Sequence, residues 1–318
     1  MGLISEAPVA WRLLNGVICV YKPSGVSSYD LRKTLIGNIA SDLCDLKCRP
    51  PTDYVSIQET SGAGYEVSTV PSYADHPLVV GPRYQPKDVR CAWATYLGKH
   101  TSGVFVLGLN RGISVARKLH RNRPIRTYHV SGRLGEATDT YFTDGKVVEK
   151  STFRHVKHSI LDRILASIQA AHQKHMFEQC GIDIQSQAAY ELAVQGLIRP
   201  HDSKIPIIYG IKCVSFDPPN FTLEIHSMNE YEDYLKTLIH EIGLQLHSVA
   251  TCTAVRCIKY SHFSLEYALL RKHWHLQHIL NNLILCQEII DKYKYLTNQT
   301  SAKLINTEEE SRTLLEAS

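Results

Sequence analysis

The sequence predicts a mixed α/β fold, in which helices flank a sheet, for a chain of 318 residues. Hydrophobic residues make up 44% of the chain and charged residues 21%, which is typical of a globular protein with a core and not of a disordered chain. Runs with strand-like and helix-like spacing alternate along most of the sequence. No run of about 18 apolar residues occurs, so no membrane span is predicted.

Strands are predicted where short runs of apolar and β-branched residues are bounded by turn residues. The first run follows an Asn-Gly pair and ends at Pro23 and Gly25, and a later run reads GVFVLGL. Two runs flank the turn DPPN at 217–220, which predicts a hairpin. The predicted strands are residues 15–22, 103–109, 126–134, 205–216 and 221–227.

Helices are predicted where apolar residues recur at a spacing of three and four. Isoleucine or leucine at positions 160, 161, 164, 165 and 168 gives the clearest example. The predicted helices span residues 28–36, 111–120, 159–179, 188–195, 234–246 and 274–296.

The domain organisation follows from where this periodicity stops. Between residues 41 and 86 it dissolves into turns and isolated apolar pairs, which is typical of an insertion or long binding loop. We therefore expect one domain over residues 14–270 that contains this insertion, and a helical extension over residues 271–297. Residues 298–318 are polar and acidic and predict a disordered tail.

Cysteine usage and the N-terminus bear on the compartment. The nine cysteines are an odd number without CxxC spacing, which favours free thiols in a reducing compartment over disulfides or a zinc site. The first 14 residues lack the basic start and apolar run of a signal peptide, and Glu6 disfavours a mitochondrial presequence. The cytosol, the nucleus and the mitochondrial matrix stay open on this evidence.

Charge is concentrated in one part of the chain. The net charge of +4 is too small to indicate a partner by itself. Between residues 111 and 126, however, six basic side chains and one histidine occur without an acid, and we call the six the basic cluster: Arg111, Arg117, Lys118, Arg121, Arg123 and Arg126. Such a cluster suits phosphate groups. On charge alone, a solvated helix face is an equally good interpretation.

The common catalytic motifs are absent. Gly98-Lys99 is followed by His100 where a phosphate-binding loop needs Ser or Thr. The sequence contains no GxSxG, GxGxxG or HExxH pattern, so it does not support a serine hydrolase, a dinucleotide-binding enzyme or a zinc protease.

Four blocks of the sequence, in a fixed order, point to a family. Residues 15–25 read NGVICVYKPSG, residues 126–145 contain RTYHV and LGEATDT, residues 189–193 read AYELA, and residues 223–256 combine a strand, a helix and Arg256. Together they resemble the TruB family of RNA pseudouridine synthases. Within that family, the detailed similarity is to the mitochondrial branch. The second block is the most specific.

The resemblance implies a pseudouridine-synthase-like domain with a central RNA-binding cleft, which isomerises uridine in RNA without a cofactor or a metal. It implies RNA contacts by Lys22, Arg256 and the basic cluster, and location in the mitochondrial matrix. Tyr128 matches the tyrosine that stacks on the target base, although a strand tyrosine without those flanking motifs is more often a core residue. The additional C-terminal RNA-binding module of many bacterial relatives is not expected.

Position 98 departs from the family. Residues 92–103, AWATYLGKHTSG, match the segment that carries the nucleophilic aspartate, and Ser102 and Gly103 set a register that places Gly98 at the aspartate position. Glycine has no carboxylate. Lys236 matches the arginine that pairs with that aspartate, so with Gly98 opposite we expect Lys236 to face an anionic gap that an RNA phosphate or water could fill. A surface lysine is an equal alternative.

The leading hypothesis is therefore a protein that binds mitochondrial mRNA or tRNA-like RNA but performs little or no isomerisation. One alternative is an active isomerase that uses a displaced carboxylate, with Asp88 as the nearest candidate. Another is a scaffold that meets other RNA-processing proteins, for which the basic cluster is incidental. Salt-dependent RNA binding separates the scaffold from the other two.

Overall fold

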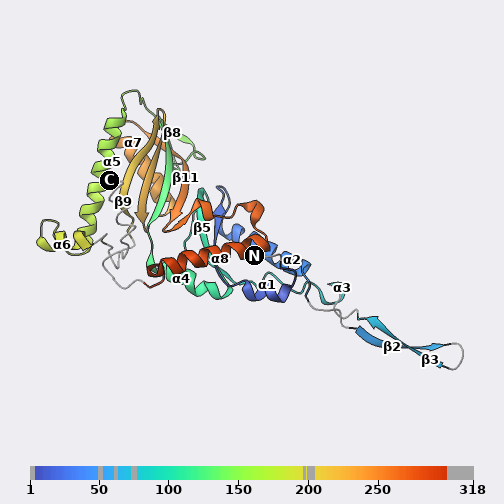
Figure 1. Cartoon of the computed structure of the whole chain (residues 1–318). Helices are drawn as coiled ribbons and strands as arrows, with labels where there is room; N and C mark the ends of the chain where they lie inside the picture. The colour runs from blue at the N-terminus through green and yellow to red at the C-terminus, as the bar shows by residue number, and fades with distance from the viewer. Residues whose placement is uncertain are drawn as a thin grey trace.

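A mixed sheet forms the body of the molecule in the computed structural model, which describes residues 4–48, 53–60, 64–72, 77–195, 198 and 205–298 (Figure 1). Within these residues the sheet has eight strands: six follow the order β1-β5-β11-β6-β10-β9, with β4 beside β5 and β12 beside β11. This confirms the predicted mixed α/β class. The strands are β1 (Gly16–Lys22), β4 (Cys91–Trp93), β5 (Thr101–Leu109), β6 (Arg126–Leu134), β9 (Ile207–Asp217), β10 (Asn220–Met228), β11 (Ala250–Tyr260) and β12 (Phe263–Ser264).

The parallel pair of β5 and β11 joins the two halves of this sheet, whose other described strand pairs are antiparallel. Gly103 on β5 lies opposite Cys257 on β11. Its φ of +114° is one that L side chains rarely adopt, and an added Cβ would lie closer than 3.0 Å to the backbone of Cys257. Only glycine permits this approach of the two strands.

Helices cover the sheet along its length. Among the described residues, α7 packs on β11 and β6, α5 on β9, α8 on β1, and α4 on β4 and β5. Leu35 and Ile39 of α2, Leu283 of α8 and Ile242 of α7 belong to one continuous core. The helices are α1 (Ala7–Leu13), α2 (Ser28–Asp45), α3 (Pro77–Val80), α4 (Ile113–Asn122), α5 (His158–Gln179), α6 (Gln187–Gln195), α7 (Glu232–Gln245) and α8 (Leu276–Lys292). Short 3₁₀ turns are η2 (Asn110–Gly112), η3 (Leu265–Tyr267), η4 (Arg271–His273) and η5 (Lys294–Leu296).

The first predicted helix is much longer than its pattern indicated. We predicted its end at residue 36, before Gly37, but α2 continues to Asp45. Ile39 and Leu43 are fully buried on the core side of the added turns. Their burial outweighs the low helix propensity of one glycine.

The segment from 41 to 86, predicted as an insertion or long loop, contains a hairpin. Strands β2 (Asp53–Thr60) and β3 (Gly64–Pro71) pair antiparallel with each other, and the hairpin extends away from the body of the molecule (Figure 1). Ile57 and Val67 face each other across the two strands and are mostly exposed. Apolar and polar residues alternate over only a few positions in these two strands, and most of their residues are polar. The sequence pattern therefore did not predict them.

Five further strands were missed: β4, β7 (Glu136–Thr138), β8 (Val147–Lys150), β11 and β12. Strand β11 lies in the middle of the sheet although threonines, an arginine and a lysine interrupt its apolar residues. Strands β7 and β8 form a small hairpin, and the Asp144-Gly145 pair lies in the segment that connects them. Residues 299–318, nearly all of the predicted disordered tail, lie outside the described residues.

No helix in the described part of the chain is both long and apolar enough to cross a membrane. All nine cysteines lie in that part and none is in a disulfide. Among the same residues, no group of three or more His, Cys, Asp or Glu side chains is arranged to hold a metal ion.

Candidate functional site

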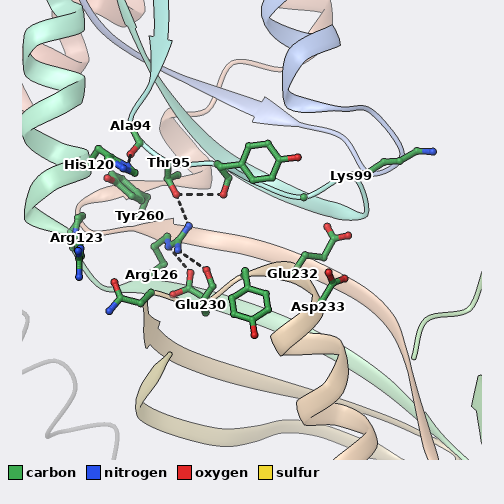
Figure 2. A pocket seen from close by; sticks show the side chains of 15 residues that line it. Ala94, Thr95, Lys99, His120, Arg123, Arg126, Glu230, Glu232, Asp233 and Tyr260 are labelled. Atoms are coloured by element: carbon green, nitrogen blue, oxygen red, sulfur yellow. Dashed lines mark hydrogen bonds and ion pairs between the residues drawn. The ribbon is translucent and has the colours of Figure 1, made fainter. Parts of the chain in front are cut away.

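A cavity of about 570 Å³ lies where the loop after β4 meets the start of β6 and the start of α7 (Figure 2). The loop contributes Thr95, Gly98 and Lys99 to its wall, and Arg126 and Glu232 line it from β6 and α7. The volume is in the range of pockets that hold a small molecule or one nucleotide. Gly98, the position predicted to lack the nucleophile, is thus part of the cavity wall.

The side chain of Glu232 fills the space next to Gly98. A Cβ added to Gly98 would lie 2.7 Å from the Cβ of Glu232 and would overlap the Oε2 atom and the carboxyl carbon of that side chain. Real Cβ atoms essentially never approach other atoms so closely. The Glu232 carboxylate therefore occupies the volume that a side chain at position 98 would enter.

Three donors hold the Glu232 carboxylate. The backbone nitrogen and the Oγ1 of Thr101 each donate to its Oε2 over 2.7 Å, and Nζ of Lys236 donates to its Oε1 over 2.9 Å. Burial acts to raise the pKa of Glu232, but these hydrogen bonds and the Lys236 charge outweigh it, so the pKa lies below its ordinary value. The carboxylate is ionised at neutral pH.

Lys236 does not face an anionic gap, so that prediction is wrong. It pairs with Glu232 one helical turn earlier and, over 3.4 Å, with Asp233. Its side chain is only 8% exposed, which also excludes the surface-lysine alternative. Burial acts to lower the pKa of Lys236, and the two acids raise it above its ordinary value.

Lys22 is buried, which corrects its prediction as an RNA contact. Its side chain is 0% exposed, and its Nζ donates to the carbonyl oxygens of Thr101 at 2.8 Å, Lys99 at 3.2 Å and Pro23 at 3.3 Å. Ser28 on α2 also donates to the same loop, at Leu97. Lys22 therefore fixes the loop that carries Gly98 and leads into Thr101, which supplies two of the three donors of Glu232.

Burial lowers the pKa of Lys22 from 10.5 to about 8, although the negative charge of Glu232 acts to raise it. Between these two pH values the unfolded chain holds a proton that the native chain has lost, so Lys22 makes the free energy of unfolding rise with pH. We expect this rise, relative to the Lys22→Met variant, to total roughly 3 kcal/mol. Urea unfolding of both proteins from pH 7 to pH 11 measures it. Parallel stability curves for the two would contradict the assignment, because alkaline titration of tyrosines and cysteines affects both equally.

Arg126 closes the wall of the cavity. Its guanidinium group donates to the Glu230 backbone oxygen over 3.0 Å, pairs with the Glu230 carboxylate and donates to the hydroxyl of Thr95 (Figure 2). Arg126 is 9% exposed and Glu230 is 5% exposed. Because its donors are engaged inside the protein, Arg126 is a structural residue of the wall and not the phosphate contact that we predicted.

Tyr128 lies behind Arg126. It is 2% exposed and does not line the cavity, and the guanidinium carbon of Arg126 lies 5.9 Å from the centre of its ring. Burial raises the pKa of Tyr128 well above its ordinary value. Because the ring is buried, a base can stack on it only after the side chains that cover it move, and the stacking role stays a prediction.

The rest of the basic cluster is divided between two places. Arg111, Arg117, Lys118 and Arg121 are exposed on η2 and α4, whereas Arg123 lines the cavity together with His120. Arg256 is exposed on β11, 5.7 Å from the ring centre of Tyr21, and does not line the cavity. RNA contacts at these residues stay predictions.

Asp88 lies outside the cavity wall that contains Gly98. It is exposed in the turn before β4, where its carboxylate accepts from the backbone nitrogen of Gln85 over 2.8 Å, and it does not line the cavity. The carboxylate that the sequence reasoning missed is Glu232. Its one sequence signal is that it precedes Lys236 by four residues, the spacing of an ion pair on a helix.

Comparisons with known proteins identify the family that the four sequence blocks resemble. Residues 85–231 match the family model described as TruB family pseudouridylate synthase, N-terminal domain. The chain is 42% identical to the mitochondrial pseudouridylate synthase TRUB2 of Xenopus tropicalis over 88% of both chains, and 39% identical to that of Homo sapiens over 84% of this chain and 82% of that protein. Among solved structures, the archaeal box H/ACA sRNP Nop10-Cbf5 complex contains a chain with 15% identity and a TM-score of 0.43, of which this chain covers 60%.

Proposed function

The chain belongs to the TruB family of pseudouridylate synthases, and on this basis we propose that it binds uridine-containing RNA in mitochondria and holds a uridine in the cavity beside Gly98. The observation that carries the proposal is the cavity itself, at the place where the family motifs meet. The compartment follows the relatives, which are named as mitochondrial. We assign this role to residues 14–270 together with residues 271–297, whose helix α8 packs on β1 and belongs to the same core.

The exposed face of α4 is the proposed path of the RNA backbone. Its basic side chains Arg117, Lys118 and Arg121 are exposed, and His120 from the last turn of the same helix lines the cavity. A backbone that follows this face would bring its next nucleotide to the cavity mouth. Phosphate contacts of this kind supply affinity without sequence preference.

Binding and isomerisation are separate questions in this protein, because Gly98 contributes no carboxylate. Capture of the RNA depends on cations and on the shape of the cavity, whereas isomerisation needs an anionic group at the nucleotide. The proposed function is therefore tested by binding alone.

Replacing Arg117, Lys118 and Arg121 together with glutamine should weaken RNA binding and reduce its salt dependence. Each lost phosphate contact removes about 0.7 from the slope of log affinity against log salt for single strands, so a total reduction of about 2 is expected. Fluorescence anisotropy with a labelled uridine-containing single strand, from about 50 to about 200 mM salt, measures the slope.

The matched control replaces three other exposed basic residues, Lys150, Arg154 and Lys157, with glutamine. They lie in or just after β8, which Figure 1 shows at the far end of the molecule from α4. The control should keep the slope of the unaltered protein. Equal losses in both variants would remove α4 from the interface, and a protein that binds no RNA at low salt would overturn the proposed function.

A further inference from the structure

We propose that Glu232 supplies the carboxylate that position 98 lacks, and that it is the group that reacts with the target uridine. This inference rests on the proposed function, because it requires a uridine in the cavity. It replaces Asp88 as the displaced carboxylate and makes the chain an active isomerase.

The location of Glu232 is the first argument. Its Oε2 and carboxyl carbon overlap the position of a Cβ at residue 98, closer than any real Cβ contact. An aspartate there would place its own carboxylate next to that Cβ. The same small volume of the cavity wall thus holds an acid that comes from α7 instead of from the loop.

The chemical state of Glu232 is the second argument. Lys236 pairs with it at 2.9 Å and two Thr101 donors bind its other oxygen, so it is ionised and fixed in direction. The resemblance implies a carboxylate paired with a cation at the position of Lys236, and this pair is present with the acid one turn earlier on the same helix. The side chain is 10% exposed and lines the cavity, which leaves a path for a nucleotide to reach it.

The other acids of the cavity wall are less suited to react with a uridine. Glu230 is buried in its ion pair with Arg126, and burial raises the pKa of its carboxyl group. The side chain of Asp233 is 84% exposed, and its Oδ1 lies 3.4 Å from Nζ of Lys236. Glu232 is the acid in this wall that is both ionised and held against position 98.

The reaction needs no further reagent. The Glu232 carboxylate attacks C1′ of the ribose, and the electron pair of the C1′–N1 bond leaves with the uracil. After the base turns, its C5 attacks C1′, and the electron pair of the ester bond returns to Glu232. The C5 proton passes to solvent and N1 takes up a proton, so atoms and charge balance.

The test measures tritium release from C5 and RNA affinity in the same preparations. The probe is the complete set of mitochondrially encoded RNAs, transcribed in vitro with 5-tritiated uridine, and the protein is the full chain. We expect release by the unaltered protein and a loss of roughly 100-fold or more in Glu232→Gln, with unchanged affinity. The amide keeps the shape of the side chain and an oxygen for the Thr101 donors. Glu241→Gln, an exposed acid later on the same helix, is the matched control and should release tritium at the normal rate.

A second test moves the carboxylate from position 232 on α7 to position 98 in the loop. Gly98→Asp alone should not raise activity, because the new side chain overlaps Glu232. Combined with Glu232→Gly, it should recover release to within about tenfold of the unaltered protein, since the acid returns to the loop.

Each outcome has a definite meaning. Background release by a chain that still binds the RNA set would overturn this inference and leave the proposed function intact. Release that persists in Glu232→Gln would assign the chemistry to another group. Absence of RNA binding would overturn the proposed function itself.

Discussion

Alanine at position 103 should leave most of the chain unfolded in urea concentrations that the unaltered protein tolerates. The φ of Gly103 is +114°, and an added Cβ would lie 2.7 Å from the carbonyl carbon and 2.8 Å from the nitrogen of Cys257. Both obstacles are backbone atoms of β11, so they yield only if the β5–β11 pair separates. Because this pair joins the two halves of the sheet, we expect a loss of more than about 4 kcal/mol in the free energy of unfolding.

Gly37→Ala is the matched control for this substitution. Gly37 lies within α2, and an added Cβ would meet no atom within 4 Å. The alanine should therefore stabilise the protein by about 0.5 to 1 kcal/mol through helix propensity. Urea unfolding followed by circular dichroism measures both variants. An unfolding midpoint for Gly103→Ala equal to that of the unaltered protein would show that β5 and β11 do not pair as described.

Arg126→Met should destabilise the protein by about 3 to 5 kcal/mol. The substitution leaves the buried Glu230 carboxylate without its cation and removes the donor to Thr95. Burial already raises the pKa of Glu230, although the positive charge of Arg126 acts to lower it. Without Arg126, the carboxylate should therefore take up a proton at a still higher pH. Urea unfolding at neutral pH measures the loss.

The double variant Arg126→Met with Glu230→Met distinguishes the effect of the lost ion pair from the effect of lost side-chain packing. Two apolar side chains of similar length leave no unpaired charge in the wall, so most of the stability should return. A double variant as unstable as Arg126→Met would contradict this account, because the loss would then come from packing and not from an uncompensated charge.

The sequence predicted the fold well wherever one period dominates. Strands β1 and β6 and helix α5 were found close to their predicted bounds. Strand β1 is a continuous buried apolar run bounded by turn residues, and the apolar residues of α5 recur at helical spacing. Strand β11 was not predicted because the exposed residues Ala254 and Arg256 lie on either side of the buried Val255, and a register shift at Thr253 interrupts the alternation. Its place in the centre of the sheet depends on partners far away in the chain, which no local window contains.

The site was predicted in part. The register of the motif placed Gly98 at the aspartate position of the family, and the structure places Gly98 in the wall of the cavity. Its equivalence to the aspartate stays a prediction. The buried positions of Lys22 and Arg126 were not predictable, because lysine and arginine are almost never fully buried and a local pattern does not reveal their partners. Glu232 was missed because its meaning depends on contact with residue 98, more than a hundred positions earlier.

The overlap between residue 98 and Glu232 also makes these two positions epistatic. Aspartate at 98 together with Glu232 would bring two carboxylates into one volume, where they repel each other, so each acid is accommodated more easily when the other is absent. The effect of a substitution at position 98 should therefore depend on which residue occupies position 232.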